Sequence, residues 1–303
     1  MSVSVSTARA TDRLQVVAAA LLFSTGGAAV KATALTGWQV ASFRSGIAAV
    51  VILLMLPSAR RAWSRRTVMV GVAYASTMVC YVLANKLTTA ANTTFLQSTA
   101  PLYILLLGPL FLREPVERRD GFLIAVLAVG TAMFFVGPEI PAATAPDPLT
   151  GNIVGAACGL SWGLTIVGLR WLGREARGSN NPSASAVACG NLMACLTTLP
   201  FALPVHEATA NDWLAVTYLG VFQIAVAYVF LTRGVRRVGA LEASLILLLE
   251  PVFNPVWAWL VHGERPSGWA LVGGSIIIAA TAVYAWAGSR TTSDGGTVSK
   301  LED

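Results

Sequence analysis

The sequence predicts an all-α membrane protein with ten transmembrane helices arranged as two inverted five-helix repeats. Hydrophobic side chains make up 55% of the 303 residues and charged side chains only 12%, which is about half the charged fraction of a soluble domain. The polar residues could not cover a soluble globule of this size. The apolar residues also gather in segments of membrane-spanning length, and the pattern of the first half of the chain returns in the second half.

Ten apolar segments approach the roughly 20 residues that a helix needs to cross the hydrocarbon core of a bilayer. In chain order they cover 14–30, 38–56, 67–84, 91–112, 119–136, 152–172, 184–203, 212–232, 240–262 and 268–288. We therefore expect five parts: an N-terminal tail (1–13), a first five-helix repeat (14–136), an outer linker (137–151), a second five-helix repeat (152–288) and a C-terminal tail (289–303).

Basic residues predict the orientation of these spans. One side of the predicted membrane holds 17 of the 21 Lys and Arg residues, namely Arg9, Arg13, Arg60, Arg61, Arg65, Arg66, Arg113, Arg118, Arg119, Arg170, Arg174, Arg177, Arg233, Arg236, Arg237, Arg290 and Lys300. The other side holds Lys31, Lys86 and Arg265, and Arg44 lies inside a span. Because basic residues concentrate on the cytoplasmic side, we expect a multi-pass protein of the cell inner (plasma) membrane with both termini in the cytoplasm.

The two halves repeat when the chain is shifted by 150 residues. This shift places Pro101 on Pro251 and Glu114 on Glu264, and an apolar run follows in each copy. Five spans per half is an odd number, so the second half must cross the membrane in the opposite direction. Inverted repeats are typical of secondary transporters, whose substrate site lies near the bilayer midplane between the halves.

These features resemble a known family. The ten spans, the paired Pro and Glu positions and the arginine of WQVASFRSGIAA, Arg44, are similar to the EamA-type drug/metabolite transporter superfamily, over residues 14–288. The chain looks most like YddG-type exporters of aromatic amino acids. The second copy departs from the first, because it reads GER where the first reads REP. The resemblance implies alternating-access export of small metabolites with no covalent chemistry.

Two ionisable side chains lie well inside predicted spans, Arg44 and Glu250. Charges within a membrane are costly and usually functional. From a rise of 1.5 Å per residue, Arg44 lies about 9 Å and Glu250 about 16 Å from the outer ends of their spans, a difference that an arginine side chain can bridge. Either the two side chains form a structural ion pair, or polar neighbours cap the Glu250 carboxylate, or Glu250 binds a substrate ammonium group or a coupling proton.

Candidate substrate-binding residues begin with one helix face in the third span. Aromatic rings and a thioether on this face would suit a flat apolar substrate, although tight helix packing explains the same pattern. The face carries Tyr74, Met78, Tyr81 and Asn85, and further candidates in other spans are Gln97, Ser98, Trp162, Tyr228 and Asn254.

Proline and glycine add two expectations about helix shape. Pro101 and Pro251 lie within predicted helices, where a missing N–H bends the helix, so each is either a static kink or a gating hinge. The sixth span carries glycine at every fourth position from 151 to 163, which predicts a face for close helix packing.

The sequence therefore favours an exporter of aromatic and other neutral amino acids and related small metabolites. Alternatives are a drug or nucleotide-type metabolite transporter and, more remotely, an intramembrane enzyme. We expect no enzymatic activity, no cofactor and no metal, because the four cysteines lie in apolar runs without metal-type spacing. The expected partners are a small-molecule substrate and the lipid bilayer. A nucleic-acid partner is not expected, since the arginines are spread over loops, and the oligomeric state is left open.

Overall fold

The computed structural model describes residues 2–61, 63–112, 118–136, 140–175, 182–235, 238 and 240–298. Within these ranges the chain is helical almost throughout, and the only strand-like pairing is a bridge between Ala142 and Ala145. The predicted all-α fold class is therefore confirmed. Glu114, which the repeat pairs with Glu264, lies outside the described residues.

The helices follow one another with short connections. Their bounds are α1 (Ser2–Ser24), α2 (Gly26–Lys31), α3 (Gly37–Met55), η1 (Pro57–Arg60), α4 (Arg65–Leu87), α5 (Ala90–Gln97), α6 (Ala100–Leu112), α7 (Arg118–Ala132), η2 (Met133–Phe135), α8 (Pro148–Glu175), α9 (Pro182–Ala202), α10 (Ala210–Tyr218), the π-helix η3 (Leu219–Val226), α11 (Ala227–Gly234), α12 (Ala240–Leu247), α13 (Leu249–His262) and α14 (Gly268–Val298).

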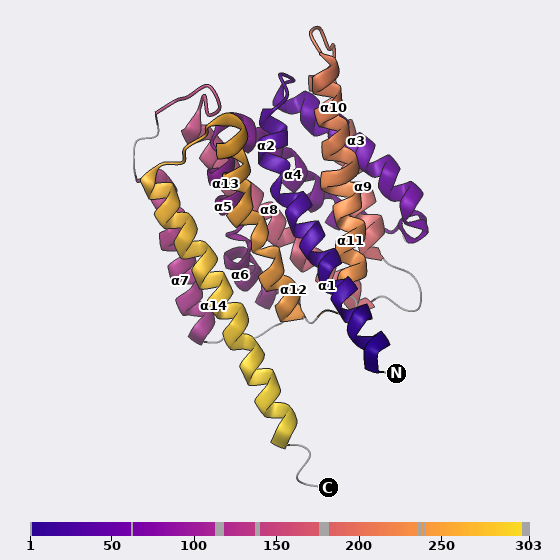
Figure 1. Cartoon of the computed structure of the whole chain (residues 1–303), viewed down its shortest axis with the longest axis vertical. Coiled ribbons are helices and arrows are strands. Elements are labelled where there is room, and N and C mark those ends of the chain that lie inside the picture. The colour runs from indigo at the N-terminus through magenta and orange to yellow at the C-terminus, as the bar shows by residue number, and fades with distance from the viewer. Residues whose placement is uncertain are drawn as a thin grey trace.

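The bundle has two distinct ends. Helix α1 starts and helix α14 finishes at the lower end in Figure 1, which we call the terminal end. The segment 140–148 and the start of α10 lie at the upper end, which we call the linker end. The first half begins with α1 running away from the terminal end, and the second half begins with α8 running toward it. The two halves thus cross in opposite directions, as expected for inverted repeats.

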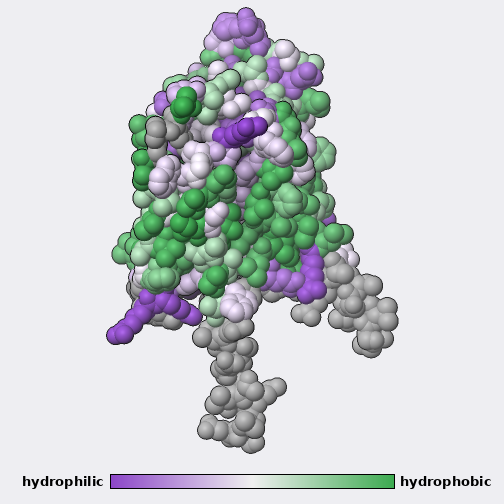
Figure 2. Space-filling view, turned by 60° about the vertical axis from the view of Figure 1, so that its left-hand side comes forward, coloured by the Kyte–Doolittle hydropathy of each residue, from purple (hydrophilic) through white to green (hydrophobic). Residues whose placement is uncertain are grey.

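Nine helical segments in the described part are long and apolar enough to cross a membrane. They cover Thr11–Lys31, Gly37–Met55, Arg65–Leu87, Ala90–Phe111, Pro148–Arg174, Pro182–Ala202, Ala210–Gly234, Glu242–His262 and Gly268–Ala287. Figure 2 shows the matching surface, a broad hydrophobic band around the middle of the visible face with hydrophilic residues toward both ends. Such a band is what lipid tails would contact.

The remaining predicted span, 119–136, is the fifth in chain order, and its helix is shorter than the nine described above. It consists of α7 and the 3-10 turn η2, which together extend about 27 Å at 1.5 Å per residue. This helix lies beside α14 (Figure 1), and the two backbones approach closely, because a Cβ atom on Gly273 would lie 2.6 Å from the carbonyl oxygen of Gly130. The chain therefore has a helix in each of the ten predicted segments.

The two terminal helices extend beyond the predicted spans. Helix α1 begins at Ser2, where the sequence predicts a tail up to residue 13, and α14 continues to Val298, where it predicts a tail from residue 289. The thickness of the hydrocarbon core sets only the length of the apolar part of a helix. The helix can continue beyond it into water, because its backbone hydrogen bonds are formed within the helix itself.

Helix α8 packs through its glycine face, as the sequence predicts. A Cβ atom on Gly159 would lie 2.5 Å from the carbonyl oxygen of Leu96, and one on Gly155 would lie 3.0 Å from the Leu96 side chain. Toward the linker end, Gly151 meets the backbone of Thr88 in the same way. Without side chains on this face, α8 lies directly against α4, α5 and α6.

We expect Gly159→Val to destabilise the protein strongly, because its side chain would have to displace the backbone of α5. Overpacking of this kind typically costs about 1–3 kcal/mol, and a valine pressed against backbone atoms belongs at the upper end of that range. Fluorescence-detected thermal unfolding in detergent should show a lower melting temperature. The matched control is Gly173→Val on the same helix, because no atom of the described residues lies within 4 Å of that Cβ position. Equal melting temperatures of the two variants would contradict the assignment.

Candidate functional site

Two spans at equivalent places in the repeat are interrupted near their middle. The fourth span breaks between α5 and α6, and the ninth breaks at Leu248 between α12 and α13. Pro101 and Pro251 lie immediately after these breaks, in the first turns of α6 and α13. Proline lacks the N–H that would bond to the fourth residue before it, so within a helix it causes a kink or a break, whereas a first turn tolerates proline well.

The prolines therefore start new helices instead of bending continuous ones. In the described part, the prolines within helix interiors in these two spans are Pro109 and Pro255. Interrupted helices at the interface of two repeats are the usual place for a transporter's substrate site. The role of Pro101 and Pro251 as hinges stays a prediction.

Arg44 lies at the centre of a polar cluster between the two halves. Its side chain is 1% exposed, and its Nη2 donates to the Met78 carbonyl oxygen at 2.9 Å. Its Nη1 donates a long hydrogen bond of 3.5 Å to Gln223 Oε1. The guanidinium carbon also lies 5.4 Å from the centre of the Tyr81 ring, in cation–π geometry. Arg44 thus joins α3 and α4 of the first half to η3 of the second.

Tyr81 extends this cluster to α13. The Asn254 side chain, which is fully buried, donates through Nδ2 to the Tyr81 hydroxyl oxygen at 3.2 Å. We call Arg44, Tyr81, Gln223 and Asn254 the polar cluster. The Nε atom of Arg44 and the Oδ1 atom of Asn254 are buried and have no hydrogen-bond partner within the described residues. Unpaired buried polar atoms are rare in proteins and call for an explanation.

Glu250 lies one helical turn before Asn254 on α13 and is half-buried. Among the described residues the ion pairs are Arg13–Glu242 and Lys31–Glu264, and Glu250 has neither an ion pair nor a hydrogen bond. The expected direct pair between Arg44 and Glu250 is therefore absent. Arg44 and Glu250 were expected at similar depths in the membrane, but similar depth alone does not bring two side chains into contact.

Four of the predicted substrate-binding residues meet in one apolar surface. Tyr74 is buried in a cluster with small residues of α3 and α9, and Met78, Trp162 and Tyr228 pack against the same cluster while remaining half-buried. We call these four residues the aromatic wall. Because α4 runs from the terminal end to the linker end, Tyr74 and Met78 lie on the terminal-end side of Tyr81. The wall and the polar cluster are therefore neighbours, joined by the Arg44–Met78 contact.

The remaining candidates lie at the edges of this region. Asn85 is fully buried and donates to the Tyr81 carbonyl oxygen at 2.9 Å, while its own Oδ1 has no partner among the described residues. Gln97 accepts a weak contact from the Cys158 thiol at 3.7 Å. Ser98 bonds within its own span to the Thr94 carbonyl oxygen at 2.8 Å. Nothing in the structure connects Ser98 to the polar cluster or the wall.

Gln223 belongs to the site but is not among the residues that the sequence analysis selects. Its signal was a single amide within the apolar run VFQIAVAYVF. It lies on the π-helix η3, and π-helical turns within α-helices are frequent at functional sites.

In the described ranges no group of three His, Cys, Asp or Glu side chains could hold a metal ion.

Comparison with known proteins gives the same architecture. A solved crystal structure matches 93% of this chain and 99% of its own chain, with a TM-score of 0.61 and 21% sequence identity, which supports the fold alone. The Pseudopaline exporter CntI of Pseudomonas aeruginosa (strain UCBPP-PA14) is 27% identical over 275 residues, covering 88% of this chain and 93% of the relative. A protein of Archaeoglobus fulgidus described as a transporter is 27% identical over 211 residues, covering 69% of this chain and 72% of its own.

The family comparison covers most of the chain. The sequence profile of the EamA-like transporter family matches twice, at residues 13–136 and at residues 149–286. Two matches to one profile fit a chain built from two related halves. The relatives reported above are named as transporters or exporters. This multi-pass membrane protein belongs to the EamA-like transporter family.

Proposed function

We propose that this protein is an inner-membrane secondary transporter that exports aromatic and other neutral amino acids by alternating access between its two halves. The observation that carries the proposal is the contact between the aromatic wall and the polar cluster at the interface of the halves. The name of the Pseudomonas aeruginosa relative, an exporter, supports the direction of transport. The excess of basic residues predicts that the terminal end faces the cytoplasm.

The two surfaces match the two parts of an aromatic amino acid. Tyr74, Trp162 and Tyr228 offer ring faces and edges for an apolar side chain, and Met78 adds a polarizable thioether. The neighbouring polar cluster offers the unpaired donor of Arg44 and the unpaired acceptor of Asn254. A polar head group bound there would provide the missing hydrogen bonds. The half-buried wall residues lie toward the terminal end, where an exported molecule would enter.

The alternative functions have less support from the site. A nucleotide-type substrate would need several cations near Arg44 to bind its phosphates. Lys31 is ion-paired with Glu264, and Lys86 donates to the Thr33 carbonyl oxygen at 2.6 Å, both at the linker end. An apolar drug would fit the wall but would leave the polar cluster unmatched. A role as a transporter and not as an enzyme also agrees with the names of the relatives.

We expect Trp162→Ala to weaken export of aromatic amino acids while the protein is made at normal levels. A well-placed ring pair contributes about 0.5–1.5 kcal/mol beyond area burial, so the apparent affinity should fall by roughly three- to tenfold. The measurement is counterflow of labelled phenylalanine and alanine in proteoliposomes, and alanine should be affected less because it uses little ring surface. Trp259→Ala is the matched control, since that side chain is 52% exposed on the outside of α13. Unchanged phenylalanine affinity in Trp162→Ala would show that the wall is packing alone.

A further inference from the structure

A buried ion pair joins the two halves at the linker end. The Nζ atom of Lys31, at the end of α2, lies 3.1 Å from Oε1 of Glu264 in the connection between α13 and α14. Both side chains are 3% exposed. Charges removed from water to this extent persist only when further hydrogen bonds complete their shells.

Those further bonds come from two more parts of the chain. Lys31 Nζ donates to the carbonyl oxygens of Asn85 at 2.7 Å and Thr88 at 2.8 Å, and also to that of Thr144. Glu264 accepts a 3.0 Å hydrogen bond through Oε2 from the backbone N–H of Ala90. The pair therefore ties α2, the corner between α4 and α5, the segment 140–148 and the corner between α13 and α14 into one closed contact.

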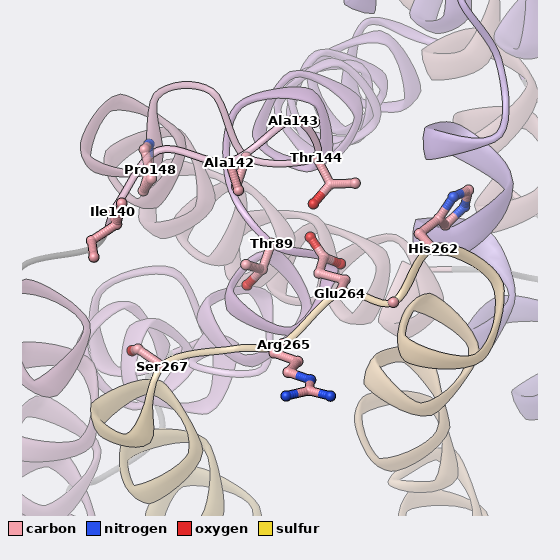
Figure 3. A pocket seen from close by; sticks show the side chains of 12 residues that line it. Thr89, Ile140, Ala142, Ala143, Thr144, Pro148, His262, Glu264, Arg265 and Ser267 are labelled. Atoms are coloured by element: carbon pink, nitrogen blue, oxygen red, sulfur yellow. The ribbon is translucent and has the colours of Figure 1, made fainter.

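The ion pair separates the polar cluster from a pocket at the surface. On its inner side Asn85 bonds to the Tyr81 backbone, one helical turn away. On its outer side lies a pocket of about 550 Å³, lined by residues of 140–148 and 262–267 together with Thr89. Figure 3 shows Glu264 pointing toward Thr144 in this pocket, while Arg265 points the other way. A second cavity of about 170 Å³ adjoins Lys31 and Asn85.

The ion pair that joins the two halves at the terminal end is much more exposed than the Lys31–Glu264 pair. It forms between Arg13 of α1 and Glu242 of α12, and its side chains are 53% and 35% exposed. Exposed pairs contribute little to stability, whereas a buried pair is hard to separate because each charge is left without its partner. Of these two ion pairs between the halves, the one at the linker end is therefore the harder to separate.

We propose that the Lys31–Glu264 ion pair is the linker-end gate, which must separate before a transported molecule can pass from the polar cluster to the pocket of residues 140–148 and 262–267. The proposal rests on the alternating-access mechanism proposed above, but not on the identity of the substrate. It assigns a gating function to two residues that lie outside the aromatic wall and the polar cluster.

The test measures access to a single cysteine placed behind the gate. Cys80, Cys158, Cys189 and Cys195 are first replaced by alanine, and Asn85→Cys then supplies a reporter at a position with no exposed surface. The protein is held in lipid nanodiscs, where a charged maleimide reaches both faces, so the result does not depend on orientation or substrate. We expect Glu264→Gln or Lys31→Met to raise the labelling rate of this cysteine by at least about tenfold, the equivalent of 1.4 kcal/mol in the closed–open equilibrium.

Two controls separate gate opening from unfolding. Glu242→Gln breaks the exposed pair at the terminal end and should leave the labelling rate unchanged. A second reporter, Ala188→Cys, is fully buried away from the gate, and it should stay protected in every gate variant. Equal labelling of Asn85→Cys with and without the pair, or faster labelling of both reporters together in the gate variants, would overturn the proposal. A failure of amino-acid transport in liposomes would instead contradict the proposed function while leaving these labelling results intact.

Discussion

Replacing Arg44 by alanine is expected to reduce transport by about ten- to a hundredfold at matched protein levels. The guanidinium group connects the Met78 carbonyl, Gln223 and the Tyr81 ring, and it keeps one unpaired donor in the site. A hydrogen bond to a charged group contributes about 1.5–3 kcal/mol, which corresponds to this range of affinities. Counterflow of a labelled neutral amino acid in proteoliposomes measures the effect.

The matched control is Arg66→Ala at the terminal end. Arg66 also stacks on an aromatic ring, with its guanidinium carbon 4.9 Å from the centre of Trp171, but its side chain is exposed. That variant should transport normally. Arg44→Lys should have an intermediate effect, because an ammonium keeps the charge but cannot donate in two directions as the planar guanidinium does. Normal transport by Arg44→Ala would remove the polar cluster from the mechanism.

The sequence was sufficient to find Arg44 and Glu250, because a charge inside an apolar span is rare and costly. It was not sufficient to pair them. Counting residues along a span estimates depth in the membrane, whereas contact also requires that two helices turn the right faces toward each other. In the structure Arg44 turns toward α4 and η3, and it forms no ion pair with Glu250.

For the aromatic wall too, the sequence pattern predicts contacts along one helix but not contacts between distant spans. Spacing along one helix placed Tyr74 and Met78 on one face, and the structure packs them together. That Trp162 and Tyr228 complete this surface depends on packing between distant spans, which periodicity does not report. The continuation of the same stripe, Tyr81 and Asn85, belongs instead to the polar region nearer the linker end.

The linker-end ion pair was the least accessible feature to sequence reasoning. Lys31 and Glu264 stand at the ends of apolar runs, where water ordinarily surrounds charged side chains. They are buried because the segment 140–148 folds back over the bundle, with the N–H of Asp147 bonded to the Leu87 carbonyl oxygen at 3.1 Å. A loop of this kind has no hydrophobic period from which its path could be predicted.

Replacing Glu250 by glutamine is expected to abolish transport driven by a pH gradient while leaving exchange of substrate intact. The carboxylate lies within a span one helical turn from Asn254, is half-buried, and has no ion pair or hydrogen bond among the described residues. A carboxylate without an ion pair or hydrogen bond can take up and release a proton without breaking a structural contact. Ionisable side chains inside membrane spans are also usually functional. Glutamine keeps the shape of the side chain but cannot titrate. Gradient-driven uptake should fall by at least about tenfold, a loss of 1.4 kcal/mol or more, and counterflow without a gradient should stay near the wild-type rate.

Two further measurements decide between the roles open to Glu250. If the carboxylate binds the ammonium group of the substrate instead of a proton, counterflow should fall together with gradient-driven uptake. If it stabilises the fold, the melting temperature of Glu250→Gln should drop, an outcome we do not expect because the side chain has no partner to lose in the described part of the chain. Glu242→Gln, on the same span but exposed at the terminal end, controls for the loss of an acid as such. Wild-type rates in both transport assays, with normal stability, would exclude Glu250 from coupling and from substrate binding, and the charge of Arg44 would then be the single ionic group of the central site still open to a role in transport.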